Sequence, residues 1–106
     1  MREFEVDGIP LKMGRNRYEN DALLKSMDPE DTWFHLEGLP SAHLSMPRDY
    51  KKISKHTLYR IALQVKKSSK FKSKHVLPVM YTYRKNLTLT EIIANPIVSK
   101  YKTVNT

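Results

Sequence analysis

The chain has 106 residues, of which 40% are hydrophobic, and it contains no cysteine. This length fits one small domain with a modest core, and the lack of cysteine excludes disulfides, thiolate catalysis and thiolate-bound zinc. No stretch approaches the roughly 20 apolar residues of a membrane-spanning helix, and acidic residues occupy the N-terminus where a signal peptide needs apolar ones. We therefore expect a protein of the cytoplasm, or alternatively of the nucleus, with no membrane partner.

The formal net charge of +8 is distributed unevenly along the chain. Residues 1–47 contain five Lys/Arg and nine Asp/Glu, which gives a net charge of −4. Residues 48–75 contain ten Lys/Arg and one Asp, which gives +9. Residues 76–106 contain four Lys/Arg and one Glu, which gives +3. Such segregation is typical of a surface that binds a polyanion, most often nucleic acid. The alternative is a solvated lysine-rich face that only aids solubility.

The beginning of the chain predicts a β-hairpin. Residues 2–6 and 9–13 read as half-buried strands, and Asp7-Gly8 between them is a strong signal for a two-residue turn. Pro10 has no N–H to donate, so we expect it at a sheet edge or facing away from the pairing.

A helix is predicted to follow the hairpin. Asn16 is a natural N-cap, and Glu19 three residues later forms a capping-box-like pair with it. We place Tyr18 and Leu23 among its inward residues, and Asp28-Pro29 should end the helix.

Two strands, Thr32–Glu37 and Ala42–Met46, are predicted around a turn at 38–40. If those three residues form the turn, His35 stands directly opposite His43. Because side chains alternate along a strand, the hairpin has two faces, and the sequence leaves open which of them is buried. The face of the two histidines also carries Trp33, Glu37, Ser41 and Ser45, and the other carries Phe34, Leu36, Ala42 and Leu44.

The second half of the chain predicts one long helix and two strands. Tyr50–Lys67 has helical periodicity, Ser68–Lys74 reads as a basic loop, and Val76–Tyr83 reads as a strand. Thr90–Asn95 is predicted as a short helical turn and Ile97–Val104 as a last strand. With no repeat or linker, residues 1–106 predict a single α+β domain with a small antiparallel or mixed sheet and two main helices.

Several short motifs together resemble the NFACT-R domain, the RNA-binding domain of ribosome quality-control factors related to the nuclear export mediator factor. The resemblance includes the short homologues that carry the domain near their N-terminus. It implies RNA binding without catalysis or a cofactor. This chain departs from the family pattern at Thr88, where a basic residue is usual, and at 93–96, which replaces a glycine-containing turn. The matching elements are Gly14-Arg15-Asn16 with Asn20, Asp31-x-Trp33-Phe34-His35, Ser41-x-His43, and Tyr81-Thr82 with Asn86-Leu87.

The start of the first helix is a candidate phosphate site. Free N–H groups and the positive end of the helix dipole favour an anion there, and Arg15 beside Asn16 can hold a phosphate. The other interpretation is that Asn16 is only a cap and Arg15 pairs with Asp31 or Glu19. Asn20, one helical turn further along, is also a candidate nucleic-acid-binding residue. Its other interpretation is that it braces the following loop.

The tryptophan–histidine face is a second candidate. Trp33 can stack on an exposed base, and His35 and His43 can hydrogen-bond bases or phosphates. Alternatively, Trp33 fills the core and the histidines are structural donors. With Glu37, the histidines also match the two-His-one-carboxylate set of some metal sites, but no ligand-spaced motif supports a metal.

The long helix and its following loop carry seven lysines that we expect to contact phosphates. Tyr59 is interleaved with them, as is typical where a nucleic-acid backbone is followed and bases are stacked. Alternatively, Tyr59 and Leu63 pack against a strand, which would leave only the loop lysines free. The seven are Lys52, Lys55, Lys66, Lys67, Lys70, Lys72 and Lys74.

The combined prediction is a non-catalytic domain that binds structured RNA, either ribosomal or transfer RNA, with the ribosome as a further candidate partner. Affinity would come from counterion release and shape recognition. The alternatives are a protein–protein adaptor, a DNA-binding module and, with less support, a small metal-dependent nuclease. The sequence does not specify the oligomeric state.

Overall fold

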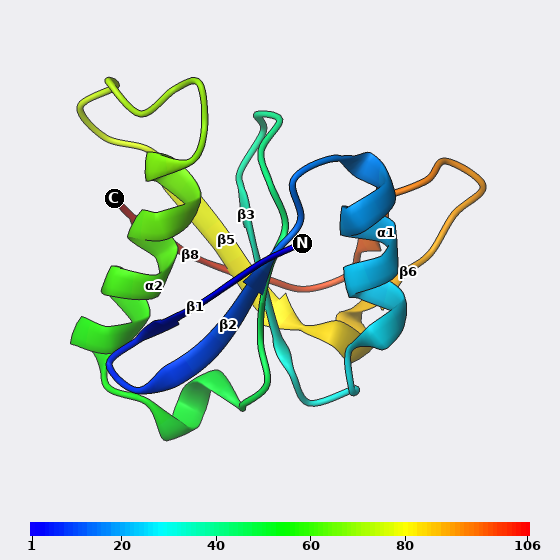
Figure 1. The fold of residues 1–106 in the computed structure, drawn as a ribbon, viewed down its shortest axis with the longest axis horizontal. Helices are drawn as coiled ribbons and strands as arrows, with labels where there is room; N and C mark the ends of the chain where they lie inside the picture. The colour runs from blue at the N-terminus through cyan, green and yellow to red at the C-terminus, as the bar shows by residue number, and fades with distance from the viewer.

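A computed structural model describes residues 1–106. Its centre is a six-stranded antiparallel sheet in the order β1-β2-β4-β3-β5-β8, with α1 (Arg17–Ser26) and α2 (Lys55–Lys67) on either side of it (Figure 1). The predicted α+β fold with two main helices is confirmed. The sheet consists of β1 Arg2–Val6, β2 Ile9–Met13, β3 Thr32–Leu36, β4 Leu44–Met46, β5 Pro78–Tyr83 and β8 Lys102–Asn105. Outside it lie β6 Leu87–Thr88 paired with β7 Ile97–Val98, and the short 3-10 helices η1 Tyr50–Lys52 and η2 Arg84–Asn86.

The first hairpin forms as predicted. Asp7 and Gly8 both have positive φ, 51° and 79°, which is the geometry of a two-residue turn that follows the twist of its strands. Pro10 stands opposite Glu5, and β4 pairs with β2 only at Lys12 and Met13. Pro10 therefore lies outside the second ladder and interrupts no pairing.

The second hairpin has the predicted register. Thr32 pairs with Met46 and Phe34 with Leu44, after which the two strands separate toward the tip. His35 and His43 continue the same register beyond the last pair, with ring centroids 4.9 Å apart. The predicted juxtaposition of the two histidines is confirmed.

Both faces of β3 are buried, because each helix covers one of them. Phe34 is 0% exposed and belongs to the larger core with Ile61 of α2. Its neighbour Trp33 points the other way, is 1% exposed, and packs against Leu24 of α1 and Leu87. The sequence did not indicate that a helix also covers the face of β3 that carries Trp33.

Several predicted elements are corrected by the structure. The long second helix is interrupted after η1 and restarts at Ser54, whose hydroxyl accepts a hydrogen bond from the Thr57 N–H and so forms a new N-cap. The predicted helical turn at 90–95 is an irregular loop in which Ala94 has φ 58°, and the last strand is divided into β7 and β8. Tyr18, which we placed inward on α1, is 62% exposed. None of the helices combines the length and the apolarity that crossing a bilayer requires.

Candidate nucleic-acid interface

Three connecting segments far apart in sequence meet at one end of the molecule. They are the junction before α1 at 14–16, the tip of the β3–β4 hairpin at 38–43, and the loop after α2 at 68–75, all at the top of Figure 1. We call this the loop end. The segments enclose a cleft of about 520 Å³, whose lining includes Arg2, Arg15, Asn16, Ser41, Ser69 and Lys70.

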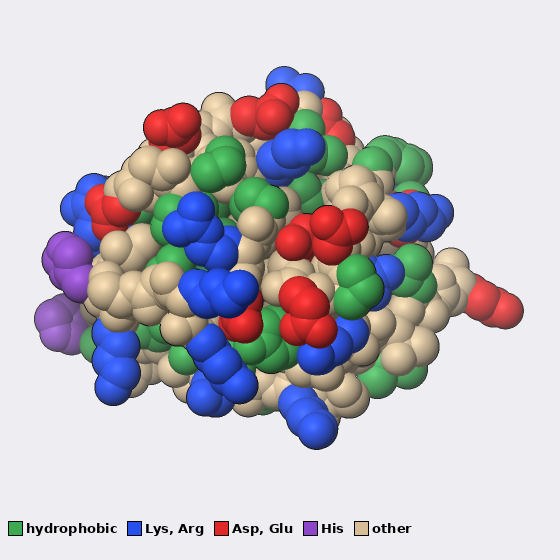
Figure 2. All heavy atoms as spheres, turned by 90° about the horizontal axis from the view of Figure 1, so that it is seen from below, with side chains coloured by type: hydrophobic (Ala, Val, Ile, Leu, Met, Phe, Trp, Pro, Cys, Tyr) green, Lys and Arg blue, Asp and Glu red, His purple; other side chains and the backbone are tan.

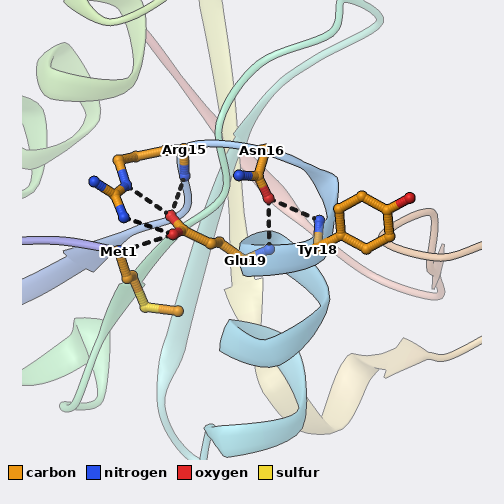
Figure 3. Close-up of polar contacts among 5 residues, drawn as sticks. All are labelled: Met1, Arg15, Asn16, Tyr18 and Glu19. Atoms are coloured by element: carbon orange, nitrogen blue, oxygen red, sulfur yellow. Dashed lines mark hydrogen bonds and ion pairs between the residues drawn. The ribbon is translucent and has the colours of Figure 1, made fainter.

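The α1 start is held by side chains of the chain itself. Asn16 Oδ1 accepts from the N–H groups of Tyr18 and Glu19, at 3.1 and 3.0 Å, so two of the free helix donors are already used (Figure 3). Asn16 is thus the predicted N-cap. A phosphate cannot use those two N–H groups while the cap is in place.

Glu19 points back from the first turn toward Arg15, as Figure 3 shows. Its carboxylate accepts from the backbone N–H, Nε and Nη2 of Arg15, at 2.9, 3.0 and 2.8 Å, and also lies 2.9 Å from the amine of Met1. These hydrogen bonds, from Arg15 first, hold the pKa of Glu19 well below its ordinary value. The capping box is therefore modified, because the carboxylate bonds the N–H of Arg15 in place of that of Asn16. Arg15 pairs with Glu19 and not with Asp31, whose carboxylate accepts from the Asp28 N–H.

Gly14 and Asn20 join α1 to the hairpin tip. Asn20 is buried, and its Oδ1 accepts from the His43 N–H at 3.2 Å, while the Gly14 N–H donates to the His43 carbonyl at 3.1 Å. Asn20 therefore braces the hairpin tip and not the loop that follows α1. Its predicted contact with nucleic acid stays a prediction.

Trp33 is not available for stacking. It is 1% exposed, and its Nε1–H donates to His43 Nδ1 at 3.1 Å. The prediction that its ring stacks on a base is wrong, because α1 and Leu87 cover it. His43 is also buried, at 3% exposure, whereas His35 is half-buried and borders two cavities beside the hairpin tip.

Both histidines are neutral near pH 7. Burial lowers the pKa of His43 to about 3, with a smaller effect from His35, and burial also lowers the pKa of His35. Neither ring therefore offers a positive charge to a phosphate at physiological pH.

The free energy of unfolding should fall as the pH is lowered from 6.5 to 5.0. In the unfolded chain His43 takes up a proton near its ordinary pKa of 6.5, whereas the folded protein resists protonation down to about 3. The unfolded state thus binds more protons across this interval, and the loss from His43 is about 2 kcal/mol. Urea unfolding at several pH values measures it. His43→Asn keeps an acceptor for Trp33 but cannot titrate, so a dependence equally steep in that variant would contradict the assignment.

The lysines at the C-terminal end of α2 and on the loop that follows it are exposed, with one exception. Lys67, Lys70, Lys72 and Lys74 all lie in solvent. Lys66 is buried, and its Nζ donates to the carbonyl oxygens of Thr106 at 2.8 Å and His75 at 3.3 Å. The predicted phosphate contact of Lys66 is wrong, because its ammonium group already holds the end of the sheet together.

Lys66→Ala should lower the free energy of unfolding by about 1–3 kcal/mol, because it removes the charged donor of the buried Thr106 carbonyl and of the part-buried His75 carbonyl. Its exposed neighbour is the matched control, since Lys67→Ala should change stability by less than about 0.5 kcal/mol. Urea denaturation of both variants distinguishes the two residues. Equal stability changes would show that the Lys66 contacts do not contribute.

The remaining predicted lysines lie at the opposite end of the molecule. Lys52 is in η1 and Lys55 begins α2, so they are separated from Lys67 by the length of that helix, about 18 Å. Figure 2 views this opposite end and shows Lys and Arg side chains interspersed with acidic ones. The predicted single lysine surface is therefore divided between two ends, and of the predicted lysines only Lys70 lines a cleft.

The alternative metal set does not assemble. Glu37 accepts a hydrogen bond from the Tyr101 hydroxyl at 2.7 Å, and no three His, Cys, Asp or Glu side chains lie close enough together to hold a metal ion. The two histidines instead contact each other and Trp33, through ring centroid distances of 4.9–5.6 Å.

Four residues of the loop end were missed by sequence reasoning. Ser41 was visible in the Ser-x-His motif but not assigned a role. Arg2, Ser68 and Ser69 carried no signal, because only the packing of β1 and the end of α2 brings them to the cleft. Ser69 is itself buried and donates to the Lys66 carbonyl at 2.8 Å.

The fold is that of a small α+β domain with a basic loop end. Residues 2–94 match the family described as NFACT protein RNA binding domain, so the chain belongs to this family and its resemblance is confirmed. The family supports a nucleic-acid-binding role, and its domain is not a known catalytic one.

The chain is also similar to individual proteins. The chain is 50% identical to coiled-coil domain-containing protein 25 of Danio rerio over 40 residues, which is 36% of this chain and 19% of that protein. It is also 50% identical to the Bos taurus protein of the same name over 34 residues, 32% of this chain and 16% of that one. The chain thus spans under a fifth of these relatives. The C-terminal structure of the Streptococcus suis fibronectin/fibrinogen-binding protein superposes with a TM-score of 0.86 at 21% identity, over 98% of this chain and 43% of that one, which shows the fold alone.

Proposed function

We propose that this domain binds structured RNA at its loop end, without catalysing a reaction on it. The observation that carries the proposal is the position of four exposed lysines at the loop end: Lys67 ends α2, and Lys70, Lys72 and Lys74 lie on the following loop, where Lys70 lines the cleft. No acidic side chain lines this cleft, and Arg2 adds a further cation to it. Ammonium groups along a polar cleft suit a phosphodiester backbone, which supplies most of the affinity in such complexes.

Arg15 has a secondary part in this proposal. Its side chain is 66% exposed, but Glu19 neutralises much of its charge through Nε and Nη2. The remaining Nη1 is free of these bonds and can reach a phosphate at the rim of the cleft. We expect Lys52 and Lys55 to contact phosphates only in an RNA that is long enough to extend along α2.

Ribosomal or transfer RNA is the proposed target, and the ribosome and the cytoplasm are the corresponding setting. Both RNAs have structured backbones. Long lysine side chains beside a cleft recognise the shape of such a backbone more than the sequence of its bases. DNA is the alternative nucleic acid for the same surface. The affinity for a DNA duplex of equal length is therefore the direct comparison.

Affinity measured against salt concentration tests the proposal. With four phosphates neutralised on a duplex stem, a plot of the logarithm of the association constant against the logarithm of salt concentration should have a slope of about −3.6. Fluorescence anisotropy with a labelled RNA hairpin, and with the matched DNA duplex, provides the data. A flat dependence, or no binding at low salt, would overturn the proposal.

A protein–protein adaptor is the second candidate, and one observation favours it. The loop before β7 and the first residue of β7 expose apolar side chains, with Ile92 at 64% and Ile97 at 62% exposure. If this candidate is right, partners captured from a lysate by the wild-type chain survive ribonuclease treatment and are lost in an Ile92→Ser/Ile97→Ser variant.

A further inference from the structure

A second cavity adjoins the cleft on the far side of the hairpin tip. It has a volume of about 410 Å³, within the range of small-ligand sites. Asn20, Pro40 and Ser41 line both this cavity and the cleft, so the two spaces meet at the tip of the hairpin. The cavity has polar atoms from His35 and His43 and apolar walls from Leu36, Met80 and Ile93.

The protonation of His43 is fixed by Trp33. The indole N–H can only donate, so His43 Nδ1, 3.1 Å away, must present a lone pair to it. A neutral imidazole with an unprotonated Nδ1 carries its proton on Nε2. His43 therefore presents an N–H donor from its other nitrogen.

The protonation of His35 is fixed in the opposite sense. Its Nδ1 lies 2.6 Å from the carbonyl oxygen of Leu36, and because a carbonyl can only accept, Nδ1 carries the proton. The Nε2 of the neutral ring is then an acceptor. The ring stacks on buried Trp33, with centroids 5.6 Å apart and planes 14° apart, which limits its reorientation.

The two neighbouring histidines thus form a fixed pair, one donor and one acceptor, beside a cavity with apolar walls. We propose that this cavity binds one unpaired nucleobase of the RNA, with His43 Nε2–H donating to a base acceptor and His35 Nε2 accepting from a base N–H. Each of the four bases has an acceptor and a donor next to each other on one edge, and a flat apolar body between its faces. This inference rests on the proposed function, and it assigns the histidines to the base and the loop lysines to the backbone.

Arg17 also lines the cavity, but the chemistry of the two histidine rings argues against phosphate as their own ligand. A phosphodiester has acceptors only, so the lone pair of His35 Nε2 would face its negative oxygens. Both rings also lack the positive charge that would offset this contact, since burial keeps them neutral. A base edge satisfies both nitrogens at once.

Comparison of an RNA hairpin that carries one unpaired nucleotide with the same hairpin made abasic at that nucleotide tests the inference. Both have the same phosphates and the same stem, so the ratio of their affinities isolates the unpaired base. The wild-type chain should bind the base-bearing hairpin at least about tenfold more tightly, as expected for one base that is stacked and hydrogen-bonded. The emission of Trp33, the only tryptophan of the chain, should change only with the base-bearing hairpin.

His35→Ala is the main variant, because His35 is half-buried and its only bond is to the adjacent carbonyl. It should bring the affinity ratio close to one while leaving the salt slope unchanged. His43→Asn should do the same, and Lys70→Ala should reduce the salt slope while preserving the ratio. Circular dichroism checks that each variant is folded, and if His43→Asn does not fold, His35→Ala alone decides.

The outcomes separate this inference from the proposed function. Equal affinity of the wild-type chain for both hairpins, with a steep salt slope, would overturn the base site and leave backbone binding intact. Absence of binding to both hairpins at low salt would overturn the two together. A ratio that His35→Ala leaves unchanged would also overturn the base site, as would nitrogen-15 NMR spectra that place the His43 proton on Nδ1.

Discussion

Replacing Lys70, Lys72 and Lys74 together by alanine is expected to lower the affinity for an RNA hairpin by on the order of 100-fold at 0.1 M salt. All three side chains are exposed on the loop that borders the cleft. Each phosphate contact on a duplex adds about 0.9 to the slope of log affinity against log salt, so the slope should also become shallower by about 2–3. Anisotropy titrations at several salt concentrations measure both quantities.

The matched control is the triple change of Lys51, Lys52 and Lys55. It removes the same charge, but from the opposite end of α2, about 18 Å away. We expect less than about a threefold loss, because at this salt concentration the Debye length is only about 10 Å. Equal losses from the two triple variants would contradict binding at the loop end and indicate a general response to net charge.

Gly14→Ala is expected to destabilise the protein by on the order of 3 kcal/mol or more. A methyl group at Gly14 would lie 2.0 Å from Asn20 Oδ1 and 2.8 Å from the Asn20 backbone nitrogen. The backbone atom belongs to α1 and cannot move without the helix, so the overlap must displace either α1 or the hairpin tip. The Asn20–His43 hydrogen bond should break as a consequence. Urea denaturation gives the loss of stability.

Gly38→Ala provides the comparison, because it also places a methyl group in a connecting segment. Gly38 has φ +72°, which alanine adopts with strain, but no atom lies within 4 Å of the added carbon. Its cost should be about 1 kcal/mol, from the backbone alone. If Gly14→Ala cost no more than Gly38→Ala, the close packing of the junction on α1 would not be a determinant of the fold.

The sequence predicted those parts of the fold that depend on neighbouring residues. Asp7-Gly8 specified its turn, and Asn16 specified the helix start, because the chemistry of each lies within a few positions. The pairing of His35 with His43 was also predictable, since a three-residue turn leaves one register. The break before α2 was not, although Ser54 is a good N-cap residue in its own right.

The parts that failed depend on distant segments. The sequence left open whether Trp33 is buried, because the opposite face of its strand was already apolar, and only the packing of α1 and Leu87 shows that both faces are buried. Lys66 looked like part of a basic helix face, yet its acceptors are the carbonyls of His75 and Thr106, which the sheet brings to it. The lysines of the candidate site could therefore be identified in the sequence. Their separation between two ends of the molecule could be seen only in the fold.

Backbone amide NMR shifts during titration with an RNA hairpin test the location of binding most directly. Large shifts confined to residues 14–17, 38–43 and 67–75 are expected, together with loss of signal from the loop lysines. Shifts concentrated at 49–55 and 84–86, at the far end of α2 and β5, would contradict the account.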